Sequence, residues 1–430
     1  MKKNVLIVGA GGVATVVAHK CAEYSDILGR ISIASRDPSK AQRIIENVKS
    51  RYEIDGNMIS AHQLDALDIE ATKSLIESTR SKIVINVGSS FINMSVLRAC
   101  IDCDVAYIDT AIHEDPDKVC EPPPWYANHE WKFEGECDAK HITAILGIGF
   151  DPGVVNAYTA LASSDYLDNI ESIDIFDVNA GVHGKYFSTN FDPEINFREF
   201  TGTVWSWQNA QWVSNSMFEI KRIEDLPVVG KQTLYLTGHD EIHSLSVKMK
   251  IDNIRFWMSF GDHYRNVFEV LNNLGLLSSN PVRTREGDVV VPLKVVKAVL
   301  PDPSSLAQDY RGKTCIGVLA KGDKTDIHDE VFIYNICDHE DCFSEVGSQA
   351  ISYTAGLPPV AAAILISTGE WDIGRMVNVE DLNPHQFLHV LDRLGLQTRI
   401  RHGSRDFPFT APFDGEFDIK SRMSRKIQPV

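Results

Sequence analysis

A glycine-rich turn at residues 9–14 restricts the fold of this chain more than any other feature of its sequence. The turn follows the apolar run of residues 5–8 and precedes an amphipathic stretch, so it joins a buried strand to a helix. Glycines at its first and third positions permit a tight turn and a close backbone approach to a pyrophosphate, and the small sixth residue lets helix and strand pack closely. Free N–H groups at the start of the helix bind the anion. The segment therefore predicts a dinucleotide-binding turn formed by Gly9, Gly11, Gly12, Val13 and Ala14.

The first 150 residues alternate between short apolar runs and amphipathic stretches. The predicted strands cover residues 4–8, 30–34, 58–62, 83–87, 106–109 and 143–146. The predicted helices cover residues 13–24, 39–51, 69–79, 93–103 and 125–140. Alternating strands and helices indicate right-handed βαβ units and a parallel sheet. The sequence thus predicts an α/β protein in which residues 1–150 form an N-terminal Rossmann domain.

The end of the second predicted strand distinguishes the two nicotinamide cofactors. A site that prefers NAD places a carboxylate there, which binds the ribose 2′-hydroxyl group. This chain has Ser35 and Arg36 at that point, followed by Lys40, and these side chains suit a 2′-phosphate. Asp37 follows the arginine and could instead serve a ribose. We favour NADP(H) as the cofactor.

Further cofactor contacts are expected where the other strands end, because ligands of open parallel sheets collect at the carboxyl ends of the strands. Asp65 follows the third strand and could meet the adenine end of the cofactor, although a helix cap or turn residue is an equal alternative. The ends of the fourth and fifth strands add Gly88, Ser89, Asp109 and Thr110.

Composition excludes several classes of protein. The chain has 430 residues, which is too long for one hydrophobic core, and a formal net charge of −17. Such an acidic surface repels nucleic acid and anionic lipid, so we expect neither as a partner. No apolar run approaches the roughly 20 residues that cross a bilayer, and the N-terminal run is too short for a signal peptide, so we expect a cytoplasmic protein. Cys100 and Cys103 form a lone CxxC pair without a second pair or suitable histidines, so we expect reduced structural cysteines and no metal site.

The sequence changes character after residue 150. Alternating strand-like runs with many aromatic residues predict an α+β domain at residues 151–345, which would bind substrate. A helical segment at residues 346–398, broken at residues 356–359, is expected to pack back on the Rossmann domain. Residues 399–430 are polar and irregular, and we expect a mobile tail.

Ionisable residues that follow the fifth and sixth strands are candidates for the reacting centre. His113 could exchange a proton near neutral pH, although a structural role is at least as well supported. Asp151 precedes Pro152 and Gly153 and could act in catalysis, but the pattern favours a helix N-cap.

Two polar segments of the second domain, residues 179–186 and 190–199, have the composition of a substrate site. Lys185 and Arg198 suit a carboxylate, and Glu194 or Glu199 suits an ammonium group. For each of these residues taken alone, an ordinary surface charge is the better supported interpretation.

The glycine turn and the segments at residues 86–89, 107–111 and 147–153 together resemble the saccharopine dehydrogenase-like reductases. Within that family, residues 183–186, 190–199, 236–241, 299–306 and 345–349 are most similar to the bacterial carboxynorspermidine (carboxyspermidine) synthase branch. The resemblance implies a Rossmann domain, an α+β domain and a homodimer. It covers the chain except for about the last 30 residues.

The resemblance also implies a reaction. L-Aspartate 4-semialdehyde would condense with a diamine, 1,3-diaminopropane or putrescine, and NADPH would reduce the imine. In that reaction His113 or His183 would move the proton, and Asp151, Glu194 or Glu199 would hold the distal ammonium group. The alternatives are saccharopine dehydrogenase or another amino-acid imine reductase and, outside this class, a non-catalytic NADP-binding sensor.

Overall fold

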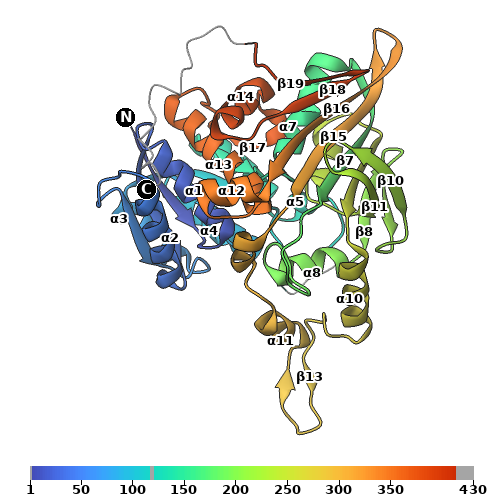
Figure 1. The fold of residues 1–430 in the computed structure, drawn as a ribbon. Coiled ribbons are helices and arrows are strands. Elements are labelled where there is room, and N and C mark those ends of the chain that lie inside the picture. Colours follow the sequence, from blue (N-terminus) through green and yellow to red (C-terminus); the bar gives the residue numbers. More distant parts are fainter. Residues whose placement is uncertain (1, 117–120, 413–430) are drawn as a thin grey trace.

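The computed structural model describes residues 2–116 and 121–412 (Figure 1). Its first sheet has seven parallel strands in the order β17-β6-β5-β4-β1-β2-β3. The order reverses beside β1, which is the point where ligands bind in open parallel sheets. The strands are β1 (Lys3–Val8), β2 (Leu28–Ser35), β3 (Ile59–Gln63), β4 (Ser81–Asn86), β5 (Ala106–Asp109), β6 (Ala144–Leu146) and β17 (Met376–Asn378).

Helices connect the first six strands, as the sequence predicted. They are α1 (Gly12–Glu23), α2 (Pro38–Arg51), α3 (Ile69–Thr79), α4 (Asn93–Asp102), α5 (Trp125–Asn128) and α6 (Glu134–Lys140). The single helix predicted over residues 125–140 was wrong, because the backbone leaves helical geometry at His129. Short 3₁₀ or π turns are η1 (Ser90–Ile92), η2 (Glu130–Phe133), η3 (Ala162–Tyr166), η4 (Pro303–Asp309) and η5 (Val379–Asp381).

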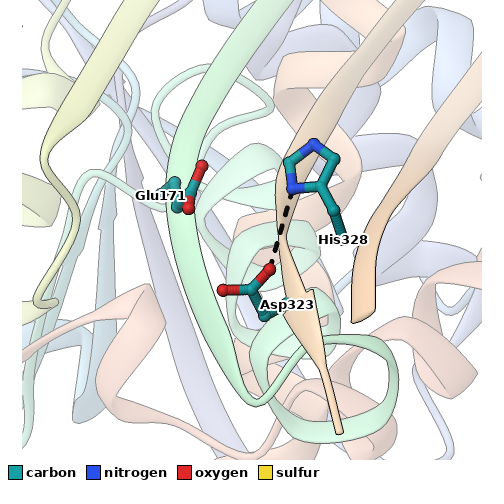
Figure 2. A group of neighbouring side chains, drawn as sticks. All are labelled: Glu171, Asp323 and His328. Carbon is teal, nitrogen blue, oxygen red and sulfur yellow. Dashed lines mark ion pairs between the residues drawn. The ribbon is translucent and has the colours of Figure 1, made fainter. Parts of the chain in front are cut away.

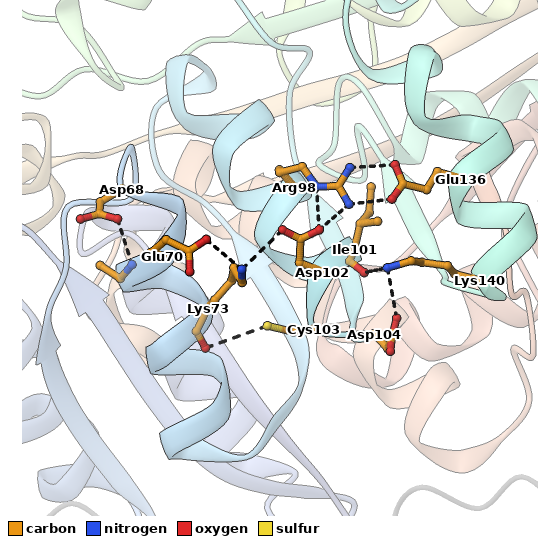
Figure 3. Close-up of polar contacts among 11 residues, drawn as sticks. Asp68, Glu70, Lys73, Arg98, Ile101, Asp102, Cys103, Asp104, Glu136 and Lys140 are labelled. Atoms are coloured by element: carbon orange, nitrogen blue, oxygen red, sulfur yellow. Dashed lines mark hydrogen bonds and ion pairs between the residues drawn. The ribbon is translucent and has the colours of Figure 1, made fainter.

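A chain of ion pairs joins α3, α4 and α6 on the outside of this domain (Figure 3). Arg98 binds Asp102 on its own helix and Glu136 on α6, and Lys73 of α3 lies 3.8 Å from Asp102. Cys103, at the end of α4, donates its thiol to the backbone oxygen of Lys73 over 4.0 Å. Its CxxC partner is fully buried, so the two cysteines pack as structural residues, and neither lines the cleft described below.

The second sheet has ten strands and is largely antiparallel, with β7 and β12 as a parallel pair at its centre. Eight strands follow the order β10-β11-β12-β7-β15-β16-β18-β19, and the β8–β9 hairpin attaches to β12. The strands are β7 (Asn169–Asn179), β8 (Val204–Gln208), β9 (Gln211–Asn215), β10 (Lys221–Leu226), β11 (Gly230–Thr237), β12 (Asn253–Ser259), β15 (Lys313–Lys324), β16 (Ile327–Asp338), β18 (Arg399–His402) and β19 (Arg405–Pro408).

Side chains alternate across this sheet. On β7, Ile173 and Ile175 belong to the main apolar core, whereas Phe176 and Val178 pack in a separate cluster on the other face. Asp177 continues the inward-facing register of the two isoleucines, so the strand directs a carboxylate to the interior side of the sheet.

The remaining helices surround this sheet or extend from it. They are α7 (Val154–Leu161), α8 (Pro193–Thr201), α9 (Glu241–Lys248), α10 (Asp262–Asn273), α11 (Pro292–Val299), α12 (His339–Val346), α13 (Ala350–Thr368) and α14 (Pro384–Leu394). Figure 1 shows α10 and α11 on an arm that ends in the hairpin of β13 (Val282–Arg283) and β14 (Val289–Val290). This arm points away from the Rossmann domain.

Helix α13 lies between the two halves of the molecule and packs along α1. The predicted break at residues 356–359 was wrong, since the helix continues through Pro358 and Pro359. Gly356 allows the close approach, because a Cβ there would lie 2.7 Å from Val16 Cβ. By length and apolar composition α13 could cross a membrane, but 83% of its most apolar window is buried inside the protein. It is therefore a core helix.

After α13 the chain adds β17 to the edge of the Rossmann sheet beside β6 and then returns to the second sheet. The irregular tail predicted from residue 399 was wrong for its first part. Strand β18 pairs with β16, and β19 completes a hairpin with β18. Residues 413–430 of the predicted tail lie outside the described residues.

Candidate active site

A cleft of about 650 Å³ separates the Rossmann sheet from the second sheet. One wall carries predicted cofactor residues, namely Gly9, Gly11, Gly12, Val13, Lys40, Gly88, Ser89 and Thr110. The opposite wall comes from four separate parts of the second domain and carries Asp151, Asp177, Glu199, His239 and Asp240. Several carboxylates on one wall of the cleft therefore face the glycine turn on the other wall.

The glycine turn has the geometry that a dinucleotide requires. Gly9 has φ +121°, and a Cβ there would lie 2.8 Å from the backbone oxygen of Val87. Gly11 is the N-cap of α1, no side chain caps this helix, and a Cβ at Gly11 would meet no atom within 4 Å. Ala14 is fully buried between helix and strand. The N–H groups of the first turn of α1 therefore face an open cradle that fits a pyrophosphate.

The loop after β2 fits a phosphorylated ribose. The Asp37 carboxylate accepts the backbone N–H of Ser39 over 2.9 Å and caps α2, so it is engaged as a helix cap. Arg36 is exposed, Ser35 Oγ donates to the backbone oxygen of Asp37, and Lys40 lines the cleft. The cations near a 2′-phosphate are therefore Arg36 and Lys40, and the Lys40 ammonium group also lies 3.9 Å from the Asp302 carboxylate.

Ser35 and Arg36 do not belong to the cleft lining, and two further predicted cofactor residues also lie outside it. Asp65 is exposed in a turn, where its carboxylate accepts the N–H of Leu67 over 3.2 Å. Asp109 is 1% exposed, and it accepts the N–H of Gly147 over 2.6 Å and the hydroxyl of Tyr107 over 2.8 Å. Burial raises the pKa of Asp109 to about 7. Both carboxylates hold the backbone near the site and do not line it.

The two histidines predicted to move a proton also lie outside the cleft lining. His113 Nδ1 is 3.0 Å from the backbone oxygen of Ser90, and its ring contacts the ring of His129. Burial and the neighbouring His129 lower the pKa of His113. His183 Nδ1 accepts the N–H of Lys185, and its ring packs edge-on against Tyr310.

The predicted substrate residues separate into different environments. Lys185 is exposed and lies outside the cleft lining. Glu194 also lies outside the lining, but its carboxylate is 3.3 Å from the ammonium group of Lys297, which lines the cleft. Arg198 is 7% exposed and turned toward another part of the protein, where it binds Glu114 over 2.9 Å. Glu199, the next residue on α8, lines the cleft.

Asp151 lines the cleft and is not the helix cap that its sequence context favoured. Helix α7 begins at Val154, and its N-cap is Gly153, with φ +131°. Asp151 therefore stands two residues before the cap, at the end of the loop that follows β6. Burial, and to a smaller degree the nearby Asp177, raise the pKa of Asp151 well above its usual value.

Sequence reasoning missed Asp177, His239, Asp240 and Glu241. Buried oxygens of Asp177 (Oδ1), Glu199 (Oε2) and Glu241 (Oε1) have no hydrogen-bond partner within the described residues. Burial raises the pKa of Asp177 to about 6 and that of Asp240 to about 7. Buried carboxylates without partners are costly, so this end of the cleft is suited to a cationic ligand. The available signal was an acidic residue in the inward register of β7.

Another group of potential metal ligands lies on the second sheet, outside the cleft lining (Figure 2). Glu171, Asp323 and His328 place their ligand atoms within 4.8 Å of one another. Glu171 and His328 are exposed, and His328 Nδ1 lies 3.7 Å from Asp323 Oδ1. These are ordinary surface charges, so we assign them no metal.

Comparisons with known proteins agree with this geometry. Residues 5–145 match the saccharopine dehydrogenase NADP binding domain, and residues 149–398 match the saccharopine dehydrogenase C-terminal domain. The fold also matches an apo saccharopine dehydrogenase (L-Glu forming) from Saccharomyces cerevisiae, with a TM-score of 0.68 and 13% identity over 94% of this chain and 100% of that one. Together with the fold and the site, the two family matches define an NADP-dependent oxidoreductase of two domains that acts on CH–NH bonds.

The chain belongs to the saccharopine dehydrogenase family. It is 41% identical to a carboxynorspermidine synthase from Vibrio cholerae over 91% of this chain and 95% of that protein. It is 38% identical to a carboxyaminopropylagmatine dehydrogenase from a Synechocystis species over 96% of this chain and 99% of that protein.

Proposed function

We propose that this protein catalyses the NADPH-dependent reductive condensation of L-aspartate 4-semialdehyde with a diamine, 1,3-diaminopropane or putrescine. The product is carboxynorspermidine or carboxyspermidine. The observation that carries the proposal is the group of buried carboxylates that lines the cleft opposite the glycine turn, in which Asp177 and Glu199 each have one oxygen without a hydrogen-bond partner among the described residues. The relatives named for carboxynorspermidine support the same reaction.

Charge favours a diamine over an amino acid as the amine substrate. Asp151, Asp177, Glu199 and Asp240 line one end of the cleft, and their pKa values are raised largely because burial disfavours their anions. A dication bound there neutralises them, whereas the two carboxylates of glutamate would add to the repulsion. The site therefore supports a diamine better than the glutamate that saccharopine formation requires.

The Rossmann side of the cleft holds the cofactor. The N–H groups at the start of α1 would bind the pyrophosphate, and the exposed Arg36 together with Lys40 would bind the 2′-phosphate. NADPH supplies a hydride to the carbon of the imine. The protein's own task is to bind the amine, direct it to the aldehyde and manage protons.

An assay of NADPH oxidation with aspartate semialdehyde tests the proposal. It compares 1,3-diaminopropane, putrescine and agmatine as the amine, the last because one relative is named for an agmatine product. A parallel reaction contains aminoadipate semialdehyde and glutamate, and mass spectrometry identifies each product. We expect turnover with a diamine. Turnover only in the glutamate reaction would instead identify a saccharopine-forming enzyme, and NADPH binding without any hydride transfer would identify a sensor.

Two variants examine the acidic wall. Asp177→Asn and Glu199→Gln each remove one carboxylate, and a charged hydrogen bond contributes about 1.5–3 kcal/mol. The KM for the diamine should rise roughly 10- to 100-fold, with a much smaller change for NADPH. Glu330→Gln, which removes a carboxylate paired with Lys321 on the second sheet, is the matched control. Equal effects of all three substitutions would contradict the assignment.

The homodimer and the cytoplasmic location are also part of the proposal. Exposed apolar side chains, including Val282, Val289 and Val299, lie on the arm that carries β13 and β14 and would suit a partner subunit. Seven described cysteines are unpaired, as a reducing compartment would keep them. Light scattering after size-exclusion chromatography measures the assembly.

A further inference from the structure

His239 is held in one orientation at the wall of the cleft. It follows β11, and its ring stacks on Phe256 with centroids 4.0 Å apart and planes 9° apart. Its Nδ1 lies 2.5 Å from Oε2 of Glu241, a residue with no exposed surface. The other ring nitrogen, Nε2, has no hydrogen-bond partner in the part of the chain that the structure describes. A ring fixed on one face and at one nitrogen can exchange a proton only through Nε2.

Carboxylates face this ring from several elements. Asp151 comes from the loop before α7, Asp177 from β7 and Glu199 from α8, while Asp240 and Glu241 flank the ring at the start of α9. Burial by itself disfavours the imidazolium, but Glu241 and then Asp151 and Glu199 outweigh it and raise the pKa of His239 well above its ordinary value. The raised pKa favours the imidazolium, which is the form of the ring that donates a proton.

We propose that His239 is the catalytic proton donor in imine formation, that Glu241 is its positioning residue, and that a neighbouring carboxylate is the proton acceptor. The inference rests on the proposed function, because imine formation is the step that needs both a donor and an acceptor. Its basis is the fixed ring at the cleft wall, among partnerless carboxylate oxygens of Asp177 and Glu199.

The protons of the step balance. The amine arrives as an ammonium ion and gives one proton to a carboxylate, which frees its lone pair. The nitrogen then bonds to the aldehyde carbon while the carbonyl π bond breaks, and a proton passes from nitrogen to oxygen to give a carbinolamine. His239 protonates the hydroxyl group, the C–O bond breaks, water leaves and an iminium ion forms. The carboxylic acid returns the first proton to His239, so the step consumes no net proton.

The arrangement also separates the two proton-transfer roles physically. A carboxylate with a raised pKa accepts a proton from an ammonium ion more readily than an ordinary aspartate does, and an imidazolium paired with Glu241 remains protonated until the hydroxyl group departs. His113 and His183, the donors expected from the sequence, lie outside the cleft lining. Among the histidines that the structure describes, His239 is the one that lines the cleft.

The test uses His239→Asn and NADPH deuterated at the transferred hydrogen. We expect kcat to fall about 10²- to 10⁴-fold, the range in which general acid–base catalysis contributes. The primary deuterium isotope effect on kcat should fall toward one, because imine formation becomes slower than hydride transfer. The Kd of NADPH, measured by fluorescence titration, should change less than about threefold, which shows that the cleft is intact.

His402→Asn is the matched control, because His402 is also paired with a carboxylate, Asp329, over 2.7 Å but lies outside the cleft lining. It should leave kcat and the isotope effect unchanged. If His239→Asn kept the wild-type kcat, or if its kcat fell while the isotope effect stayed at the wild-type value, the proposal would be overturned. Absence of condensation by the wild-type enzyme would instead refute the proposed function, so the two failures are distinguishable.

Glu241→Gln separates positioning from folding. The amide can still accept from Nδ1 of His239, but the charge that stabilises the imidazolium is lost. The pKa of His239 should therefore fall, and the high-pH limb of kcat/KM should move to lower pH. An unmoved limb would overturn the positioning role of Glu241.

Discussion

Arg198→Met removes a buried guanidinium that attaches α8 to the loop after β5. In the folded protein Arg198 binds the Glu114 carboxylate over 2.9 Å and donates to the backbone oxygens of Asp115 and Pro116. Its guanidinium also lies over the Phe91 ring, 5.1 Å from the centroid. The sequence assigned this arginine to a substrate carboxylate, but these contacts describe a structural clamp.

The size of the effect follows from what the substitution leaves behind. Removing one partner of a buried ion pair costs about 3–5 kcal/mol, because the other charge stays buried without compensation. The Glu114 side chain keeps 23% of its surface exposed, so solvent screens part of that charge. We therefore expect the free energy of unfolding to fall by about 3 kcal/mol.

Urea unfolding followed by circular dichroism measures this change. The double variant Arg198→Met, Glu114→Gln removes both charges and should recover part of the loss. Lys185→Ala removes an exposed cation that the sequence assigned to the same substrate group, and its stability should stay within about 0.5 kcal/mol of wild type. If Arg198→Met were as stable as wild type while the KM for the aldehyde rose, Arg198 would be a substrate ligand and the clamp would be refuted.

Three further predictions concern the cofactor and pH. Arg36→Ala should weaken NADPH binding roughly 10- to 100-fold and leave NADH binding unchanged, as measured by fluorescence titration; equal losses for both would contradict a phosphate contact. Gly9→Ala should weaken both cofactors at least about tenfold, because the new Cβ would lie 2.8 Å from Val87 O at a φ of +121°; wild-type affinity would refute the geometry of the turn. Asp109 and Asp240 should contribute most to stability below about pH 4. This contribution should be lost as pH rises from about 4 to about 7, because over that range the folded protein retains protons on these carboxyl groups that the unfolded chain has released. Asp109→Asn should reduce the difference in the free energy of unfolding between pH 5 and pH 8, measured with urea. An unchanged difference would contradict the raised pKa of Asp109.

The Rossmann half could be predicted from sequence because its signals are local. The predicted limits of α3 and β5 agree with the structure, since each element is set by its own hydrophobic period. The helix predicted over residues 125–140 was wrong at His129, where tertiary contacts prevail. His129 Nε2 binds Glu121 over 3.0 Å, and the next residue, Glu130, accepts the backbone N–H of His113.

The acidic wall of the site could not be predicted in the same way. Asp177 and His239 lie far apart in sequence and meet only because β7, β12 and β11 are neighbours in the second sheet. Arg198 and Glu199 are adjacent on α8 and face different surroundings, one the loop after β5 and the other the cleft. Successive residues on a helix point about 100° apart, and composition does not say which of them faces the ligand.

The return of the chain to its first domain has a consequence for protein synthesis. Domains generally fold as they emerge from the ribosome, N-terminal part first. Here β17, the edge strand beside β6, and α13, the cover of α1, come from residues 350–378. The nascent Rossmann domain must therefore wait, with its edge unpaired and α1 uncovered, until most of the polypeptide has been translated. A fragment of residues 1–150 produced alone should therefore aggregate, and a peptide of residues 350–378 supplied in trans should reduce that aggregation.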